Sequence, residues 1–182
     1  HHHLFYTTFF SLTMKLEILQ IITHLLFSTI TLKNKLLKSY VSNLARQITI
    51  NRWRPDYVVG LTRGGLVPAT MLSHWLQVPM HTLNVSLRDG DGGESNLWMA
   101  EDAFAGKKIL IVDDINDQGS TINWIKKDWS SGCFPDNDKW SQIWGDTVRF
   151  AVLTQNWASQ FRDIDYYVWQ VNKREEDCWL VY

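Results

Sequence analysis

The sequence predicts an α/β domain with a mainly parallel central sheet flanked by helices. Short apolar runs of the kind found in buried strands alternate with segments of helical pattern after residue 56. Polar, glycine-rich clusters follow several of these runs directly, and parallel sheets bind their ligands where strands end. A chain of 182 residues is long enough to bury the core of one such domain.

The N-terminal region is predicted to be helical over residues 16–50. Leucine and isoleucine recur at helical spacing in 16–32 and again in 32–48, and Pro55 marks the end of the region. We therefore expect two helices here, the first of them amphipathic and packed on the domain. Residues 1–13 begin with three histidines and are interpreted as a tag or a disordered leader, which leaves 14–182 as the single domain.

The core is expected to span residues 56–182. Apolar runs bounded by turn residues indicate its strands, and longer periodic segments indicate its helices. Residues 130–146 are predicted to form a loop-like insertion that carries tryptophans. The predicted strands are 57–61, 80–85, 108–112, 148–154 and 166–171, and the predicted helices are 66–76 and 120–129.

Composition narrows the class of protein. A formal net charge of -1 and a pI near 6.6 give no general attraction to nucleic acid, so no such partner is expected. The two cysteines are too few for a disulfide framework and favour a reducing cytoplasm. Because Glu17, Gln20 and His24 interrupt the apolar N-terminal stretch, it is not expected to enter a membrane.

Two adjacent carboxylates, Asp113 and Asp114, close the third apolar run, and a polar turn from Asp117 to Thr121 opens a helix. Backbone N–H groups, two hydroxyls and a helix N-terminus make such a turn a cradle for phosphate. Adjacent carboxylates suit the two hydroxyls of a ribose, or a hydrated Mg²⁺. Together they describe a site for a ribose 5-phosphate, although an acidic pair can also simply end a strand and Ser120 can simply cap a helix.

The segment Val112–Thr121, which reads VDDINDQGST, resembles the phosphoribosyl-pyrophosphate signature of type I phosphoribosyltransferases. The resemblance implies that fold, with a small C-terminal/N-terminal hood over the base site. Gln118 stands where the family usually has threonine, a position dominated by backbone donors. It also implies Mg²⁺ held by Asp113 and Asp114, and ribose and 5′-phosphate contacts from Asp113, Asp114, Asp117, Gln118, Gly119, Ser120 and Thr121.

Leu61–Ala69, which reads LTRGGLVPA, closely resembles the pyrophosphate loop of bacterial xanthine–guanine phosphoribosyltransferases. Glycines let a backbone approach a bulky anion, and Arg63 supplies a fixed cation. The resemblance implies a non-proline cis peptide in this loop, and pyrophosphate contacts from Thr62, Arg63, Gly64 and Gly65.

The glycine-rich stretch Ser86–Met99 corresponds in this family to a mobile loop that closes over the donor. Within it, Arg88 is the candidate for a second pyrophosphate contact. An ordinary solvated loop, whose arginine has no such role, is the alternative.

Asp117 also bears on the choice of base. In the family, aspartate at this position accompanies 6-oxopurines and acts on N7 as general base, which favours guanine, xanthine or hypoxanthine. Near the C-terminus, Trp179 matches the stacking aromatic residue and Leu180 the backbone that reads the base edge, although Trp179 can equally belong to the core. The family reads the 6-oxygen with a lysine where this chain has Gln155-Asn156, and Gln155 is the candidate that replaces it.

The resemblance thus implies transfer of a 5-phosphoribosyl group from phosphoribosyl pyrophosphate to a purine, giving a nucleoside monophosphate and pyrophosphate. The partners implied are these two substrates and further copies of the chain, as a homodimer or homotetramer. The main alternative is a regulatory domain of the same fold that senses phosphoribosyl pyrophosphate or a nucleotide without catalysis. A receiver domain fits less well, because it would carry its acidic pair near the start of the domain.

Overall fold

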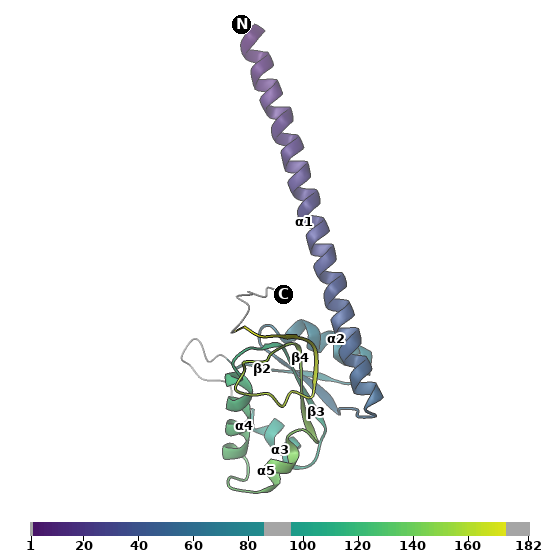
Figure 1. Ribbon diagram of the computed structural model, residues 1–182, viewed down its shortest axis with the longest axis vertical. Coiled ribbons are helices and arrows are strands. Elements are labelled where there is room, and N and C mark those ends of the chain that lie inside the picture. Colours follow the sequence, from purple (N-terminus) through teal and green to yellow (C-terminus); the bar gives the residue numbers. More distant parts are fainter. Residues whose placement is uncertain (1, 86–95, 174–182) are drawn as a thin grey trace. The chain divides into compact units, whose positions relative to one another are not determined.

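The computed structural model describes residues 2–85 and 96–173 (Figure 1). The chain forms two compact units, His1–Lys38 and Ser39–Tyr182. The first lies within the helix α1, which extends from His2 to Ile50 and also supplies the start of the second unit.

The expectation of two N-terminal helices is wrong, because α1 is continuous. Residues 1–54 contain neither proline nor glycine, so nothing in the local sequence breaks the helix at residue 32. Leu19, Ile22 and Leu25 of the first unit are exposed. By length and composition, Leu16–Ile50 is apolar enough to cross a membrane, a property shared with core helices of soluble proteins and with signal sequences. The expected absence of a membrane partner therefore stays a prediction.

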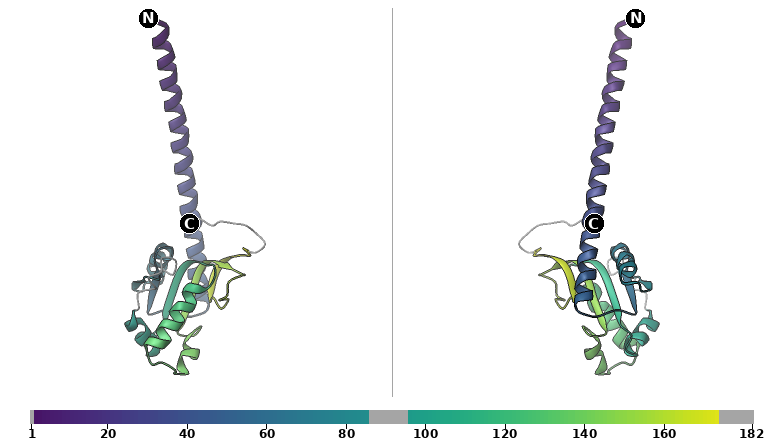
Figure 2. Two further views of the ribbon diagram at one scale, coloured as in Figure 1. Left: turned by 90° about the vertical axis from the view of Figure 1, so that its left-hand side faces the viewer. Right: turned by 90° about the vertical axis from the view of Figure 1, so that its right-hand side faces the viewer.

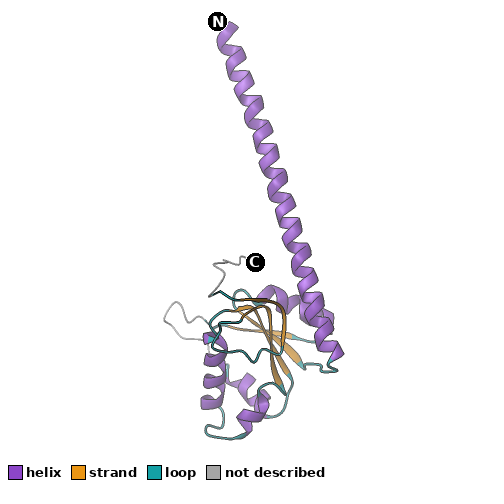
Figure 3. Cartoon of the chain, viewed as in Figure 1, coloured by secondary structure: helices purple, strands orange, loops and turns teal. Residues whose placement is uncertain are grey.

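The second unit is built on a five-stranded sheet in the order β2-β1-β3-β4-β5 (Figure 3). Each neighbouring pair in this sheet is parallel. Because β2 and β3 lie on opposite sides of β1, the winding of the sheet reverses between β1 and β3. The strands are β1 (Tyr57–Leu61), β2 (Met80–Leu83), β3 (Ile109–Asn116), β4 (Val148–Asn156) and β5 (Tyr166–Val171).

Helices cover both faces of this sheet (Figure 2). Alternate residues of β1 pack in one core cluster with α3, α4 and α5, while Gly60 faces Ala69 of α2 on the opposite side. The end of α1 joins the same unit, since Leu44 and Ile48 are buried and the Gln47 side chain donates to the Tyr167 carbonyl at 2.9 Å. The helices are α2 (Leu66–Leu76), α3 (Leu97–Phe104), α4 (Ser120–Gly132) and α5 (Lys139–Ile143).

Two strands continue further than expected, and this difference positions the site. β3 includes the acidic pair and ends at Asn116, and β4 ends at Asn156. Aspartate and asparagine are poor strand formers, but β3 and β4 stay paired as far as Asn116 and Gln155. The prediction that residues 130–146 form a loop is also wrong in part. The helix α4 continues to Gly132, and the helix α5 lies within this segment.

Candidate active site

The carboxyl ends of β1 and β3 meet at the point where the winding of the sheet reverses. This is the place where open parallel sheets bind ligands. The turn Thr62–Gly65 follows β1, and Asp113 and Asp114 lie near the end of β3. Two segments that the sequence separates by about fifty residues therefore share one edge of the sheet.

The turn after β1 begins with a cis peptide between Thr62 and Arg63, as the sequence resemblance implied. Thr62 is anchored twice: its N–H donates to the Leu83 carbonyl at 3.0 Å, and its hydroxyl donates to Oδ1 of Asn84 at 2.7 Å. The Arg63 side chain is exposed. The turn is thus held in place at Thr62, and it offers the Arg63 cation and backbone N–H groups to an anion.

Two glycines allow this turn to lie directly against β3. A Cβ on Gly64 would come within 2.3 Å of Cγ and 2.4 Å of Oδ2 of Asp114. A Cβ on Gly65 would lie 2.2 Å from the Val112 carbonyl oxygen. Real Cβ atoms do not make contacts this short, so both positions require glycine for space.

The acidic pair is held by its own backbone. The Asp114 N–H donates to Oδ1 of Asp113 at 2.9 Å, and the Ile115 N–H donates to Oδ1 of Asp114 at 2.8 Å. Burial raises the pKa of the Asp113 carboxyl well above its ordinary value, and the negative charge of Asp114 raises this pKa further. A bound cation, or hydroxyl donors, would offset both effects.

A second anion cradle follows β3. Gly119 adopts a left-handed conformation with φ of 82° and precedes α4, whose first N–H groups need a partner other than a capping side chain. A Cβ at Gly119 would lie 2.6 Å from the Phe161 nitrogen, so the turn is pressed against the segment that follows β4. The Gln160 N–H also donates to the Gln118 carbonyl at 3.1 Å.

Buried polar side chains connect the end of β3 to the segment after β4 and so hold this cradle in place. Nδ2 of Asn116 donates to the Phe161 carbonyl at 2.6 Å and to Oε1 of Gln155 at 2.9 Å. The Ser159 hydroxyl contacts Oδ1 of Asn116 at 3.3 Å and accepts from the Phe161 N–H at 3.2 Å. These bonds satisfy groups that would be costly to bury unpaired, and they fix the end of β3 relative to that of β4.

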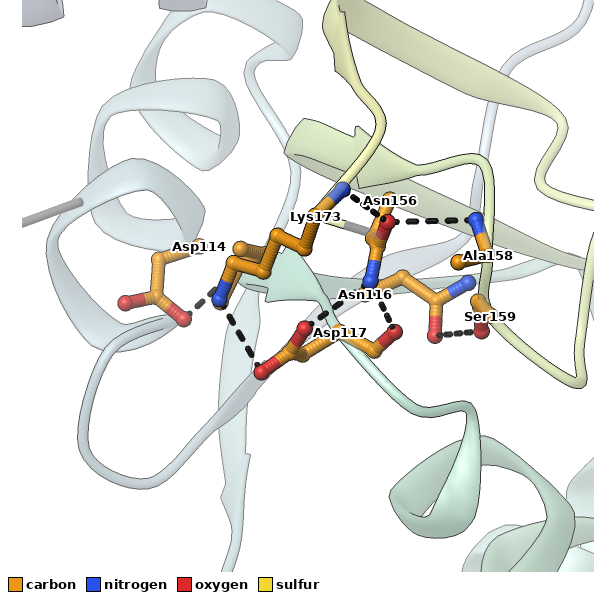
Figure 4. A network of polar contacts seen from close by, with 8 residues as sticks. Asp114, Asn116, Asp117, Asn156, Ala158, Ser159 and Lys173 are labelled. Atoms are coloured by element: carbon orange, nitrogen blue, oxygen red, sulfur yellow. Dashed lines mark hydrogen bonds and ion pairs between the residues drawn. The ribbon is translucent and has the colours of Figure 1, made fainter. Parts of the chain in front are cut away.

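Asp117 lies at the centre of a second polar network (Figure 4). Nδ2 of Asn156, at the end of β4, donates to the Asp117 carbonyl at 2.9 Å and to its carboxylate at 3.1 Å. From the segment after β5, the Lys173 ammonium lies 3.1 Å from Oδ2 of Asp117. The Lys173 and Asp117 side chains are 24% and 31% exposed, so the pair remains open to a ligand.

The conserved-domain match decides the family: residues 29–179 fit the phosphoribosyl transferase domain. The chain is a member of the phosphoribosyltransferase family. It is also 25% identical to xanthine phosphoribosyltransferase 1 of Saccharomyces cerevisiae in an alignment 105 residues long, which covers 44% of this chain and 50% of that protein. The match thus spans half the length of this curated relative.

Solved structures share the phosphoribosyltransferase fold. The purine phosphoribosyltransferase of Pyrococcus horikoshii aligns over 74% of this chain and 82% of its own, with a TM-score of 0.52 and 22% identity. The xanthine-guanine-hypoxanthine enzyme of Helicobacter pylori aligns over the same shares, with a TM-score of 0.54 and 19% identity. A Neisseria gonorrhoeae protein with bound ppGpp aligns over 77% and 85%, with a TM-score of 0.52 and 22% identity. These similarities establish the fold, and the predicted fold class is confirmed.

The structure brings together most residues that the phosphoribosyltransferase motifs predict. Thr62–Gly65 contacts Asp114, and Asp117–Thr121 continues from the same strand. Gln155, the candidate for the base, is placed differently: it is 2% exposed, and its amide is engaged with Asn116, the Asn156 carbonyl and the Phe161 carbonyl. A side chain engaged in this way supports the sheet edge, and a role for Gln155 in binding the base stays a prediction.

Three predicted features lie outside the described residues. These are Arg88, the candidate for a second pyrophosphate contact, and Trp179 and Leu180, the candidates for contacts with the base. Most of the loop 86–99 also lies outside the described residues. Sequence reasoning in turn missed Asn84, Asn156 and Lys173. Each lies just beyond or at the end of a predicted strand, which is the one signal that pointed to them.

Proposed function

We propose that this chain transfers the 5-phosphoribosyl group of phosphoribosyl pyrophosphate to a purine base, with 6-oxopurines (guanine, xanthine or hypoxanthine) favoured. The observation that carries the proposal is the contact between Gly64 and the Asp114 carboxylate. It joins an anion-binding turn to an acidic pair beside a second anion cradle. Few ligands other than a ribose with phosphates at both ends require all three.

In the donor half of the site, the Arg63 side chain and the N–H groups of Arg63 and Gly64 would hold the pyrophosphate, because the N–H groups of Thr62 and Gly65 donate to the Leu83 and Leu61 carbonyls. Gln118–Thr121 and the N-terminus of α4 would hold the 5′-phosphate, where the helix dipole favours negative charge. Asp113 and Asp114 would accept hydrogen bonds from the two ribose hydroxyls. The ribose would then be fixed at three points, so that its C1′ faces the base in one orientation.

Mg²⁺ fits the acidic pair. It is usually bound through one or two carboxylates together with substrate phosphates and water. Asp113 and Asp114 supply two such groups, and within 2–85 and 96–173 no three His, Cys, Asp or Glu side chains gather into a site of their own. When bound there, the ion would neutralise charge on the leaving pyrophosphate.

During transfer, the bond from C1′ to the pyrophosphate oxygen breaks and a bond from C1′ to a base nitrogen forms. Asp117 would take the proton that the imidazole ring of the purine gives up at N7. Asn156 donates to the Asp117 carboxylate and so orients it for this task. The main work of the protein is to position the reactants and to stabilise charge that develops on the leaving group.

The test measures pyrophosphate release from phosphoribosyl pyrophosphate and Mg²⁺, with guanine, xanthine, hypoxanthine and adenine supplied separately. We expect turnover with at least one 6-oxopurine and a loss of about 100-fold or more in Asp117→Asn, in which the proton acceptor is removed. Saturable binding of the donor without turnover on any base would contradict catalysis and favour the sensing role. Mg²⁺ dependence and a homo-oligomer remain predictions that the same preparation can test, and a cytoplasmic location also remains a prediction.

A further inference from the structure

The lysine that the family uses to read the 6-oxygen is replaced here by residues committed to the protein itself. Gln155 is buried and engaged on both sides of its amide. Asn156 is 5% exposed and is fully used: Nδ2 donates to Asp117, and Oδ1 accepts from the N–H groups of Ala158 at 3.1 Å and Lys173 at 3.2 Å. Neither amide can turn to a ligand without leaving buried partners unpaired.

The register of the sheet brings another cation to the same point. Asn116 of β3 pairs with Gln155 of β4, and Asn156 pairs with Val171 of β5. Asp117 follows Asn116 directly and Lys173 comes two residues after Val171, so the two lie on either side of Asn156. Asn156 binds both of them, which makes it a clamp between the ends of β3 and β5 (Figure 4).

The ammonium of Lys173 is suited to bind a ligand. Among the residues that the structure describes, Asp117 is its one charged partner, and a lysine ammonium carries three N–H donors. About a quarter of the side chain is exposed, at 24%, so the remaining donors can be reached. The other ion pair found among the described residues joins Lys107 to Asp102. The Lys107 side chain is 53% exposed, so it is more open to solvent than that of Lys173.

The chemistry of the purine edge matches a carboxylate with an ammonium beside it. N7 and the substituent at position 6 lie next to each other on one edge of the ring. A 6-oxopurine presents an acceptor at position 6, and adenine presents an amino donor there. If Asp117 acts on N7, an ammonium 3.1 Å from its carboxylate is near enough to reach the neighbouring position 6, where it can donate to an oxygen but not to an amino group.

We infer that Lys173 reads the 6-oxo group of the base, so that the cation comes from the end of β5 and not from the end of β4. The inference rests on the proposed function, because it concerns the base half of the same site. It assigns Lys173 to specificity for 6-oxopurines and assigns Asn156 to the orientation of Asp117.

The test compares binding of IMP and AMP to the full chain by calorimetry, in wild type, Lys173→Met and Lys173→Arg. We expect wild type to prefer IMP. The Met variant should bind IMP about 10- to 100-fold more weakly with AMP binding little changed, since a charge-assisted hydrogen bond is lost only with the 6-oxo ligand. The Arg variant should keep part of the preference, and Lys107→Met, which removes a distant ion pair, should leave it intact.

Equal weakening of IMP and AMP binding in Lys173→Met would overturn the inference and reduce Lys173 to a support for Asp117. So would an unchanged IMP preference. The two proposals fail separately: turnover by wild type with an unchanged IMP to AMP ratio in the variant rejects only the role of Lys173. An IMP preference that depends on Lys173, in a protein that turns over no base, rejects only the catalytic function.

Discussion

Substitution of Gly64 by alanine tests the donor site more directly than any change to a charged residue. The new Cβ would lie 2.3–2.5 Å from the three terminal atoms of the Asp114 carboxyl group, against ordinary contacts that begin at 3.4 Å. The carboxyl group therefore has to move by about 1 Å, or the turn has to lift from it by that amount. Gly64 does not have a positive φ, so the effect comes from space alone.

The expected effect of Gly64→Ala on activity and stability depends on how easily the Asp114 carboxyl group can move. The Asp114 carboxyl is the end of a side chain with one local bond, to the Ile115 N–H, so its displacement costs the fold about 1 kcal/mol. A displacement of about 1 Å in a positioning group costs about 100-fold in rate. We therefore expect Gly64→Ala to lower kcat/KM for the donor about 100-fold and to lower Tm by about 2–4 °C.

Gly65→Ala is the matched control, because it adds the same methyl group one residue away. Its Cβ would meet backbone atoms, at 2.2 Å from the Val112 oxygen and 2.9 Å from the nitrogen and the oxygen of Leu61. These cannot rotate away, so overpacking should cost about 1–3 kcal/mol and lower Tm by about 2–12 °C. Calorimetric donor binding and thermal unfolding separate the two variants. A Gly64→Ala protein with wild-type affinity for phosphoribosyl pyrophosphate would refute the reasoning.

Three further predictions concern neighbouring parts of the unit. Gly119→Ala should weaken 5′-phosphate binding and cost about 1 kcal/mol or more in unfolding free energy, because the residue has φ of 82° and its Cβ would meet the Phe161 nitrogen; urea unfolding and binding of ribose 5-phosphate check this. Asn156→Asp should place a second carboxylate on Asp117 and raise the pKa of one of the two, so the Tm deficit should be larger at pH 8 than at pH 5. Burial raises the pKa of the Asp165 carboxyl, so the folded state binds its proton more tightly than the unfolded chain does. The contribution of Asp165 to stability therefore falls as pH rises from its ordinary pKa through the raised one, and in Asp165→Asn this part of the pH dependence of unfolding should disappear.

Much of the fold followed from local sequence. The apolar runs predicted all five strands of the sheet, and the bounds of α2 and β5 agree with the predicted ranges. The errors have physical causes. β3 and β4 continue through aspartate, asparagine and glutamine because tertiary pairing outweighs strand propensity there. α3 and α5 are short, at 8 and 5 residues, and such helices depend on packing against the core more than on their own periodicity.

The donor half of the site was predictable because each of its parts is continuous in sequence. A turn of adjacent residues, Thr62–Gly65, meets a strand end that carries two adjacent carboxylates. The base half was not predictable in this way. Asn156 and Lys173 act across strands, and their partner Asp117 is 39 residues from Asn156 in the chain. Only the register between β3, β4 and β5 brings them to one point.

The donor half and the base half of the candidate site lie on different strand ends, so base specificity can change independently of donor binding. The proposed donor contacts come from the ends of β1 and β3, and the base contact inferred for Lys173 comes from the end of β5, with Asn156 of β4 as a support. Asp117 belongs to both halves, since it follows β3 and is held by Asn156 and Lys173. In a parallel sheet, neighbouring strand ends lie in a row, so a cation lost from one strand can be supplied by the next without moving the bound base. If the inference for Lys173 holds, a new base preference can arise at the end of β5 while the proposed phosphoribosyl site stays as it is.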